Sequence, residues 1–217
     1  ILFSIFIVLS TSKTGIISLV AIHLFALPYY IIRQKAYLKG SFAILILILG
    51  SWFTYSSSSV LQDRINEVTK IVGTANTSDG STTAARIEIW KISAKLISKK
   101  PMFGYGTGNE KEILTQEYKN NGLTNLSEKQ LNAHNQFLQT SIALGLVGGF
   151  YLLAMLILPL IQTLKMNHYI YTFFILLIGL NFMTESMFER QSGVVFYAFF
   201  NSLLYFTFVN NDNKSLN

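Results

Sequence analysis

The sequence has no cysteine and few charged residues. Of its 217 residues, 13% are charged, whereas a soluble domain has about 25%. Without cysteine there is no disulfide framework, no thiol nucleophile and no cysteine-ligated zinc site.

Apolar surface takes the place of the missing charge. Hydrophobic residues make up 51% of the sequence and aromatic residues 14%, and the mean hydropathy is +0.40. The charge deficit is local, because the apolar stretches are nearly charge-free while residues 56–132 are rich in charges. This pattern is typical of an integral membrane protein. The net charge of +6 lies in loops or is mixed with acids, so it does not predict a nucleic-acid partner.

Apolar runs flank the polar segment on both sides. A crossing helix needs about 20 residues, and we predict spans at residues 16–32, 41–55, 137–164, 169–184 and 194–209. Residues 1–9 are apolar but too short to cross alone, so we expect the chain to be part of a longer protein. Gly145, Gly148 and Gly149 predict that the helix over 137–164 enters, breaks and then continues as the true span.

The predicted fold is all-α, a polytopic transmembrane helical bundle with a large helical extracytoplasmic loop. We expect a truncated span and two transmembrane helices in residues 1–55, and a periplasmic loop with the active-site motifs in 56–133. A re-entrant helix and three transmembrane helices follow in 134–209, and a cytoplasmic tail in 210–217. Basic residues of short loops are expected on the cytoplasmic side, which places the polar insert outside the cytoplasm. These basic residues are Arg33, Lys35, Lys39, Lys165 and Lys214.

The clearest helix of the polar insert is predicted over residues 83–98. Ile89, Ile92 and Leu96 share one face of it, while charged side chains take the opposite face. Pro101 ends this helix.

Three weaker helix signals are also present in the insert. Residues 63–71 fit one short helix. Asn109 is placed to cap a second helix that would stop near Gly122, and Ser127 with Gln130 fits a capping box for a third. This third helix would carry His134 toward the membrane.

Arg86 and Trp90 lie one helical turn apart in the insert. Arginine has a planar fork of donors that suits a phosphate group, so Arg86 is a candidate contact for an anionic substrate. The alternative is an ordinary surface arginine next to a packed tryptophan.

His134 is the candidate base. Histidine can act as a general base at neutral pH; the alternative is a helix-start histidine bonded to a neighbouring backbone group. Because one substrate would have to touch both residues, we expect Arg86 and His134 to lie close together, with the turn at 185–190 below them. No second histidine or paired carboxylate stands at ligand spacing, so we predict no metal site and no cofactor.

Gly104, Gly106 and Gly108 alternate along one loop. Their backbone amides could approach an anion; the alternative is a simple turn between two helices. The loop is neither a dinucleotide fingerprint, since no strand precedes it, nor a P-loop, since the Gly-Lys-Ser/Thr ending is missing.

Taken together, these motifs resemble the C-terminal half of the O-antigen ligase and O-antigen polymerase family of bacterial envelope glycosyltransferases. The matching segments are Ser12-Lys13-Thr14-Gly15, Arg86-x-x-x-Trp90, Pro101-x-x-Gly104-x-Gly106-x-Gly108 and His134-Asn135-Gln136-Phe137-Leu138-Gln139, which runs into Leu144-Gly145-Leu146-Val147-Gly148. One position departs from the family: the turn is usually Ser-Arg-x-Gly, and Lys13 keeps the charge of that arginine without its fork.

The resemblance implies a multi-pass enzyme of the bacterial inner (plasma) membrane whose active site faces the periplasm or outside. Family members take a glycan from an undecaprenyl-pyrophosphate carrier and pass it to lipid A–core or to another lipid-linked glycan. Arg86 would contact the pyrophosphate, and His134 would be the base or would orient the acceptor. The implied substrate-binding residues are Lys13, Trp90, Gly104, Gly106, Asn135, Glu185 and Arg190. Pyrophosphate leaves readily, so a metal is not required, and direct attack would invert the anomeric carbon.

A second interpretation is a non-catalytic membrane carrier or a flippase subunit for polysaccharide export. It predicts charged residues in the middle of the spans, along a translocation path. The predicted spans are nearly free of charge, which favours chemistry at the membrane surface. The shared motifs do not separate a ligase from a polymerase.

Overall fold

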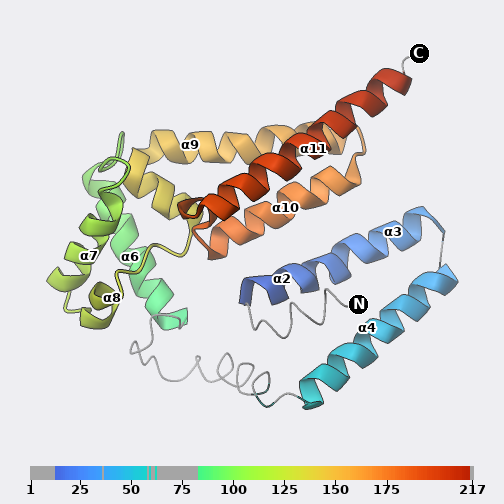
Figure 1. Cartoon of the computed structure of the whole chain (residues 1–217), viewed down its shortest axis with the longest axis horizontal. Helices are drawn as coiled ribbons and strands as arrows, with labels where there is room; N and C mark the ends of the chain where they lie inside the picture. Colours follow the sequence, from blue (N-terminus) through green and yellow to red (C-terminus); the bar gives the residue numbers. More distant parts are fainter. Residues whose placement is uncertain (1–12, 36, 58, 60–61, 63–82, 216–217) are drawn as a thin grey trace. The chain divides into compact units, whose positions relative to one another are not determined.

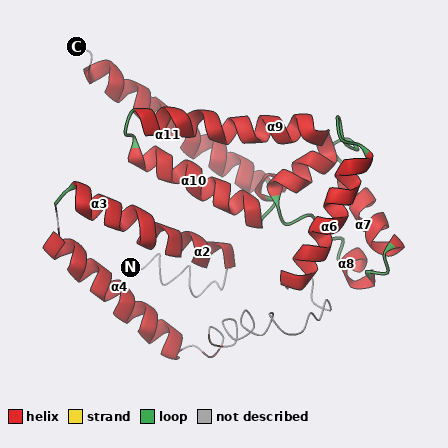
Figure 2. Ribbon diagram, turned by 180° about the vertical axis from the view of Figure 1, so that it is seen from behind, coloured by secondary structure: helices red, strands yellow, loops and turns green. Residues whose placement is uncertain are grey.

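The computed structural model describes residues 13–35, 37–57, 59, 62 and 83–215, and all regular secondary structure in these ranges is helical (Figure 2). This agrees with the predicted all-α class. The chain divides into two compact units, Ile1–Ala75 and Asn76–Asn217. The short helix predicted over residues 63–71 lies outside the described residues.

The first unit contains a helix that widens before a proline. Its elements are α2 (Lys13–Ala21), the π-helix η1 (Ile22–Ala26), α3 (Leu27–Arg33) and α4 (Tyr37–Ser57). Pro28 lacks the amide proton that would close the preceding helical turn, which explains a widened turn at this place. Gly40 packs directly against Ile31, so α4 can approach α3 closely.

The second unit has two groups of helices, joined at the start of α9 (Figure 1). Its elements are α6 (Thr83–Lys99), α7 (Glu110–Asn120), α8 (Thr124–Glu128), α9 (Gln136–Lys165), α10 (Tyr169–Thr184), the 3-10 turn η2 (Met187–Glu189) and α11 (Gln191–Ser215). The helices α6, α7 and α8 gather near the first part of α9, while α10 lies along its longer second part and α11 packs on α10.

The amphipathic helix predicted in the insert is confirmed as α6. Ile89, Ile92 and Leu96 are only 0%, 5% and 2% exposed. They form one core with Leu114 and Tyr118 of α7. The predicted spacing therefore buries the intended face.

An ion network fastens α7 to α6. Glu117 is 10% exposed, and its Oε1 lies 2.9 Å from Lys95 Nζ and 3.2 Å from Lys99 Nζ. The hydrogen bond from Lys95 lowers the pKa of Glu117, burial acts in the opposite direction, and Lys99 adds to the lowering. The carboxylate is therefore held in its charged form between two cations.

The predicted break in the long apolar helix is confirmed at Gly145, whose φ is 69° and ψ is −166° inside α9. In a continuous helix the carbonyls of Ile142 and Ala143 would accept from amides four residues later. Here they accept from Tyr105 (2.9 Å) and Gly106 (2.8 Å) instead. The loop between α6 and α7 thus satisfies the backbone groups that the break sets free.

A third hydrogen bond joins the same two segments. Leu146 N donates to Pro101 O at 2.7 Å. A Cβ at Gly104 would overlap the Ile142 carbonyl, and one at Gly145 would overlap the Met102 carbonyl. We call residues 101–106 together with 142–146 the loop–kink junction.

By length and composition, one helix in the described part of the chain could cross a membrane, and this is α9. The helix α10 is apolar but shorter, and its bounds agree with the predicted span over 169–184. The multi-pass bundle and the extracytoplasmic position of residues 56–133 stay predictions.

Two predictions about helix starts are wrong in detail. Asn109 does precede α7, but its side chain makes no capping hydrogen bond and donates to Tyr105 O instead. Ser127 lies inside α8, which ends at Glu128, so no capping box forms there. His134 consequently lies in a loop and not on a helix.

Candidate active site

Arg86, on the first turns of α6, reaches the end of α10. Its Nη1 donates to Thr184 O at 2.6 Å and its Nη2 to Glu185 Oε1 at 2.9 Å. The last carbonyls of a helix have no partner inside the helix, which explains why Thr184 O is open to the guanidinium. The side chain is 18% exposed, and its role toward a substrate stays a prediction.

Glu185 also contacts His134. His134 Nδ1 lies 3.5 Å from Glu185 Oε2. The prediction that Arg86 and His134 lie close together is therefore confirmed, because one carboxylate contacts both. We call these three residues the Arg86–Glu185–His134 cluster. The histidine contact is long for a hydrogen bond, but such contacts often shorten when a substrate binds.

The electrostatics of the cluster keep Glu185 charged. Burial alone would raise the pKa of Glu185, but its contacts with His134 and Arg86 outweigh burial and hold the pKa below its ordinary value. Two nitrogen atoms of the cluster are buried without a hydrogen-bond partner among the described residues, Arg86 Nε and His134 Nδ1. An unsatisfied buried donor costs about 1–3 kcal/mol, so Arg86 Nε calls for an acceptor, whereas His134 Nδ1 faces Glu185 Oε2.

The loop that carries His134 is fixed from several sides. His134 has a positive φ of 45°, which few non-glycine residues adopt. The residue before it is held at both backbone groups: Ala133 N donates to Gln139 Oε1 (2.9 Å), and Ala133 O accepts from Trp90 Nε1 (3.0 Å). The structure thus gives Trp90 a positioning role next to the histidine.

Asn135 joins the start of α9 to the end of α10. Its Oδ1 caps α9 by accepting from Leu138 N at 3.1 Å, and its Nδ2 donates to Met183 O at 3.2 Å. The next residue continues this link, since Gln136 Oε1 accepts from Phe188 N at 2.6 Å. These bonds set the distance between His134 and the turn that holds Glu185.

The glycine loop does not offer free amides. Gly104 N donates to Lys100 O, Gly106 N to Ala143 O, and Gly108 N to Glu110 Oε2. The prediction that these amides bind an anion finds no open donor, and the geometry agrees with the alternative of a turn. Gly104 serves close packing at the loop–kink junction.

The remaining predicted binding residues stay predictions. Lys13 begins α2 in the first compact unit. Arg190 follows η2 and is exposed.

Sequence reasoning missed two contributors to the site. The Thr184 carbonyl could have been anticipated, because the apolar run ends there and a helix end has open carbonyls. Gln139 belongs to the motif quoted above but had no assigned role. It is 1% exposed and holds Ala133, so it also positions His134.

A second carboxyl group, that of Glu189, lies on the same turn as Glu185. Burial, and then the nearby carboxylate of Glu110, raise the pKa of Glu189, while Gln139 acts in the opposite direction. The two glutamates of this turn are thus shifted in opposite directions by their surroundings.

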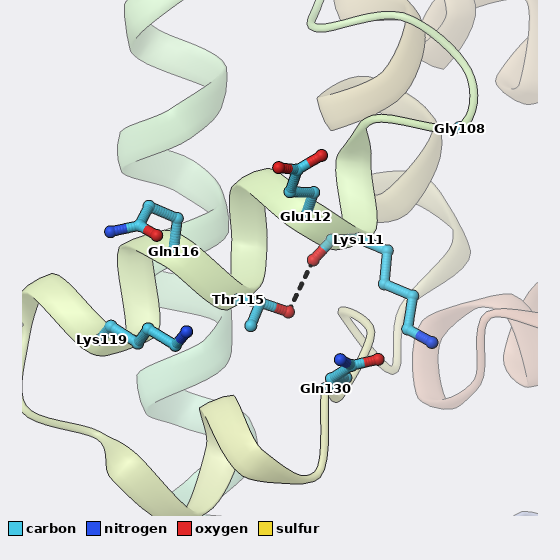
Figure 3. A pocket seen from close by; sticks show the side chains of 7 residues that line it. All are labelled: Gly108, Lys111, Glu112, Thr115, Gln116, Lys119 and Gln130. Carbon is cyan, nitrogen blue, oxygen red and sulfur yellow. Dashed lines mark hydrogen bonds between the residues drawn. The ribbon is translucent and has the colours of Figure 1, made fainter.

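A shallow hollow of about 390 Å³ lies on one side of α7 (Figure 3). It is lined by Gly108, Lys111, Glu112, Thr115, Gln116, Lys119 and Gln130. The Thr115 hydroxyl is already bonded to Lys111 O at 2.7 Å. None of the cluster residues lines this hollow.

The comparison with known proteins identifies the family of the chain. Residues 1–153 match the family described as O-antigen ligase. The chain belongs to the O-antigen ligase family. This family is membrane-associated, and its members are ligases and polymerases of glycans. The matched range contains Arg86 and His134, whereas Glu185 lies beyond it.

A curated relative covers part of the chain. An uncharacterized protein of Haemophilus influenzae is 26% identical over 132 residues, which cover 56% of this chain and 33% of the relative. The chain therefore spans about a third of the length of this relative.

Proposed function

We propose that this O-antigen ligase family member is a glycosyltransferase. It moves a glycan from an undecaprenyl-pyrophosphate carrier to a hydroxyl group of an acceptor, either lipid A–core or another lipid-linked glycan. The observation that carries the proposal is the Arg86–Glu185–His134 cluster, in which a guanidinium and an imidazole share one carboxylate.

Arg86 serves the leaving group in this scheme. As the bond between the anomeric carbon and the pyrophosphate breaks, its electron pair stays on the pyrophosphate oxygen. The buried Nε of Arg86, which has no hydrogen-bond partner in the described part of the chain, donates to that oxygen. Such a contact strengthens as negative charge develops, so it lowers the barrier more than it improves binding.

His134 serves the acceptor. The acceptor oxygen attacks the anomeric carbon on the face opposite the pyrophosphate, so the configuration of the sugar is inverted. His134 takes the proton of the acceptor hydroxyl group. Glu185 faces Nδ1 and stabilises the imidazolium that forms, in the way that a carboxylate supports a catalytic histidine elsewhere. The same carboxylate also neutralises Arg86. When Glu185 interacts more strongly with the His134 imidazolium, more of the guanidinium charge is left to stabilise the pyrophosphate.

The test is transfer from a lipid-linked oligosaccharide to defined acceptors by the full-length protein, with and without EDTA. His134→Ala should keep donor binding and lose about 10²–10⁴-fold in transfer rate. Arg86→Lys should keep the charge but lose the fork, and should be largely inactive. Lys91→Ala is the matched control, because Lys91 is an exposed residue of the same helix that pairs with Glu88.

We expect EDTA to leave the rate unchanged. Near-normal transfer by His134→Ala together with loss of activity in EDTA would replace this mechanism with a metal-dependent one. Normal glycan export without any transfer would favour the carrier interpretation.

A further inference from the structure

The loop between α6 and α7 carries two large apolar side chains at its tip. Met102 is 58% exposed and Phe103 is 74% exposed. A single exposed apolar residue is common on protein surfaces. Two neighbours at the tip of a tightly held turn call for a partner if other apolar surface continues from them.

Such a surface does continue, onto α9. The loop–kink junction bonds Pro101 O to Leu146 N and Ile142 O to Tyr105 N, so the tip lies next to the break in α9. Beyond the break, Leu146, Phe150 and Tyr151 are 57%, 68% and 70% exposed. Exposed apolar residues of α9 therefore begin directly next to the tip of the loop.

The part of α9 after the break has the length of a membrane span. From Leu146 to Lys165 the helix has about 20 residues, which span roughly 30 Å and match the hydrocarbon core. The part before the break, which leads to His134, is not needed for crossing. The tip of the loop thus lies at the level where the crossing begins.

The charge next to the tip also fits an interface. Lys100 directly precedes Pro101 and is exposed. Lys100 Nζ lies 4.7 Å from the centre of the Tyr105 ring. Lysines and tyrosines are favoured at the headgroup level, where the charge stays among the phosphates while the carbon chain lies deeper.

We propose that Met102 and Phe103 insert into the headgroup–acyl boundary of the bilayer and anchor the α6–α8 helices to the membrane surface. Lys100 would face the lipid phosphates. The anchor would hold the α6 end of the junction, and with it Arg86, at a fixed height above the hydrocarbon. This inference concerns the lipid surface and stands independently of the reaction.

The test uses spin labels on the full-length protein, made free of cysteine and reconstituted in vesicles of phosphatidylethanolamine and phosphatidylglycerol. Single cysteines at Met102 and Phe103 report the tip, Lys119→Cys reports the exposed side of α7, and Leu158→Cys reports the outward face of α9. Accessibility to oxygen and to a water-soluble nickel complex gives the depth of each label.

We expect nickel accessibility at positions 102 and 103 to be several-fold lower than at 119, with oxygen accessibility between the values at 119 and 158. Labels at 102 and 103 that match position 119 would overturn the proposal. So would labels that are immobile and shielded from both reagents, since this result indicates a protein partner at the tip.

Discussion

The α6–α8 helices and the α9–α11 helices both bury apolar residues, but the exposed surface is charged in the first group and apolar in the second. In the first group, Ile89, Leu114 and Tyr118 are fully buried, and charged side chains such as Lys91 and Lys95 lie outside. This is the arrangement of helices in water.

The second group is apolar on both sides. Leu156, Ile175 and Phe182 form its core, while Leu158 and Ile170 are 61% and 78% exposed. Helices that are apolar all round are typical of a membrane environment.

The cluster lies where these two regions meet. Arg86 belongs to α6, and Glu185 follows the last turn of α10. His134 lies in the loop just before α9 and contacts Glu185. The chemistry that we propose therefore takes place at the boundary between the two surfaces, where a lipid-linked donor would present its pyrophosphate.

Gly145→Ala is expected to have the largest effect, because it disrupts the loop–kink junction that joins the two regions. The new Cβ would overlap the Met102 carbonyl, and φ at this position is +69°. We expect a loss of about 4 kcal/mol or more in the free energy of unfolding, measured by thermal unfolding in detergent. Gly179→Ala is the matched control, since its nearest neighbour is Leu156 Cδ1 at 4.0 Å; equal effects of the two variants would contradict the role of the junction.

Sequence patterns predicted the elements that depend on local spacing. The buried face of α6 follows from Ile89, Ile92 and Leu96, and α10 has the predicted bounds. The loop position of His134 could not be predicted, because it depends on Trp90 and Gln139, which hold Ala133 across the fold.

The roles of two site features were hidden for the same reason. The sequence of the glycine loop is compatible with an anion site, but in the structure the broken helix accepts from Gly106 N, and the amides of Gly104 and Gly108 bond within the loop region. Glu185 was predicted as a substrate contact, and its position between Arg86 and His134 depends on contacts between segments far apart in the sequence.

Leu158→Asp sharpens the contrast between the two surfaces. A carboxylate on the lipid side of a helix costs about 2.5–3.5 kcal/mol near the middle of a membrane. We expect much less folded protein in the membrane fraction, measured by quantitative immunoblotting. Ile87→Asp, at an apolar position that is 46% exposed on α6, should have little effect; equal tolerance of both changes would show that α9 does not face lipid.

Glu117→Gln tests the α6–α8 helices by themselves, and its expected effect on stability is smaller. Removing the charge between Lys95 and Lys99 should cost about 1 kcal/mol in the free energy of unfolding at neutral pH, because both lysines are half exposed. Glu112→Gln, at an exposed position of the same helix, should change little.

The pH dependence of this effect has a definite sign. The pKa of Glu117 is lowered in the folded protein from an ordinary value of 4.5. Its contribution is therefore present above pH 4.5 and is lost as the pH falls through the lower folded value. The stability difference between the wild type and Glu117→Gln should shrink below pH 4.5; a constant difference would contradict the ion network.

The most direct test of the central claim is a kinetic double-mutant cycle on transfer. The rates to compare are those of the wild type, Glu185→Gln, His134→Ala and the double variant, all in the full-length protein. If Glu185 acts through His134, the double variant should be no slower than His134→Ala alone, because residues that act as a unit are not additive. Fully additive losses would show that the two residues act separately and would contradict the shared site.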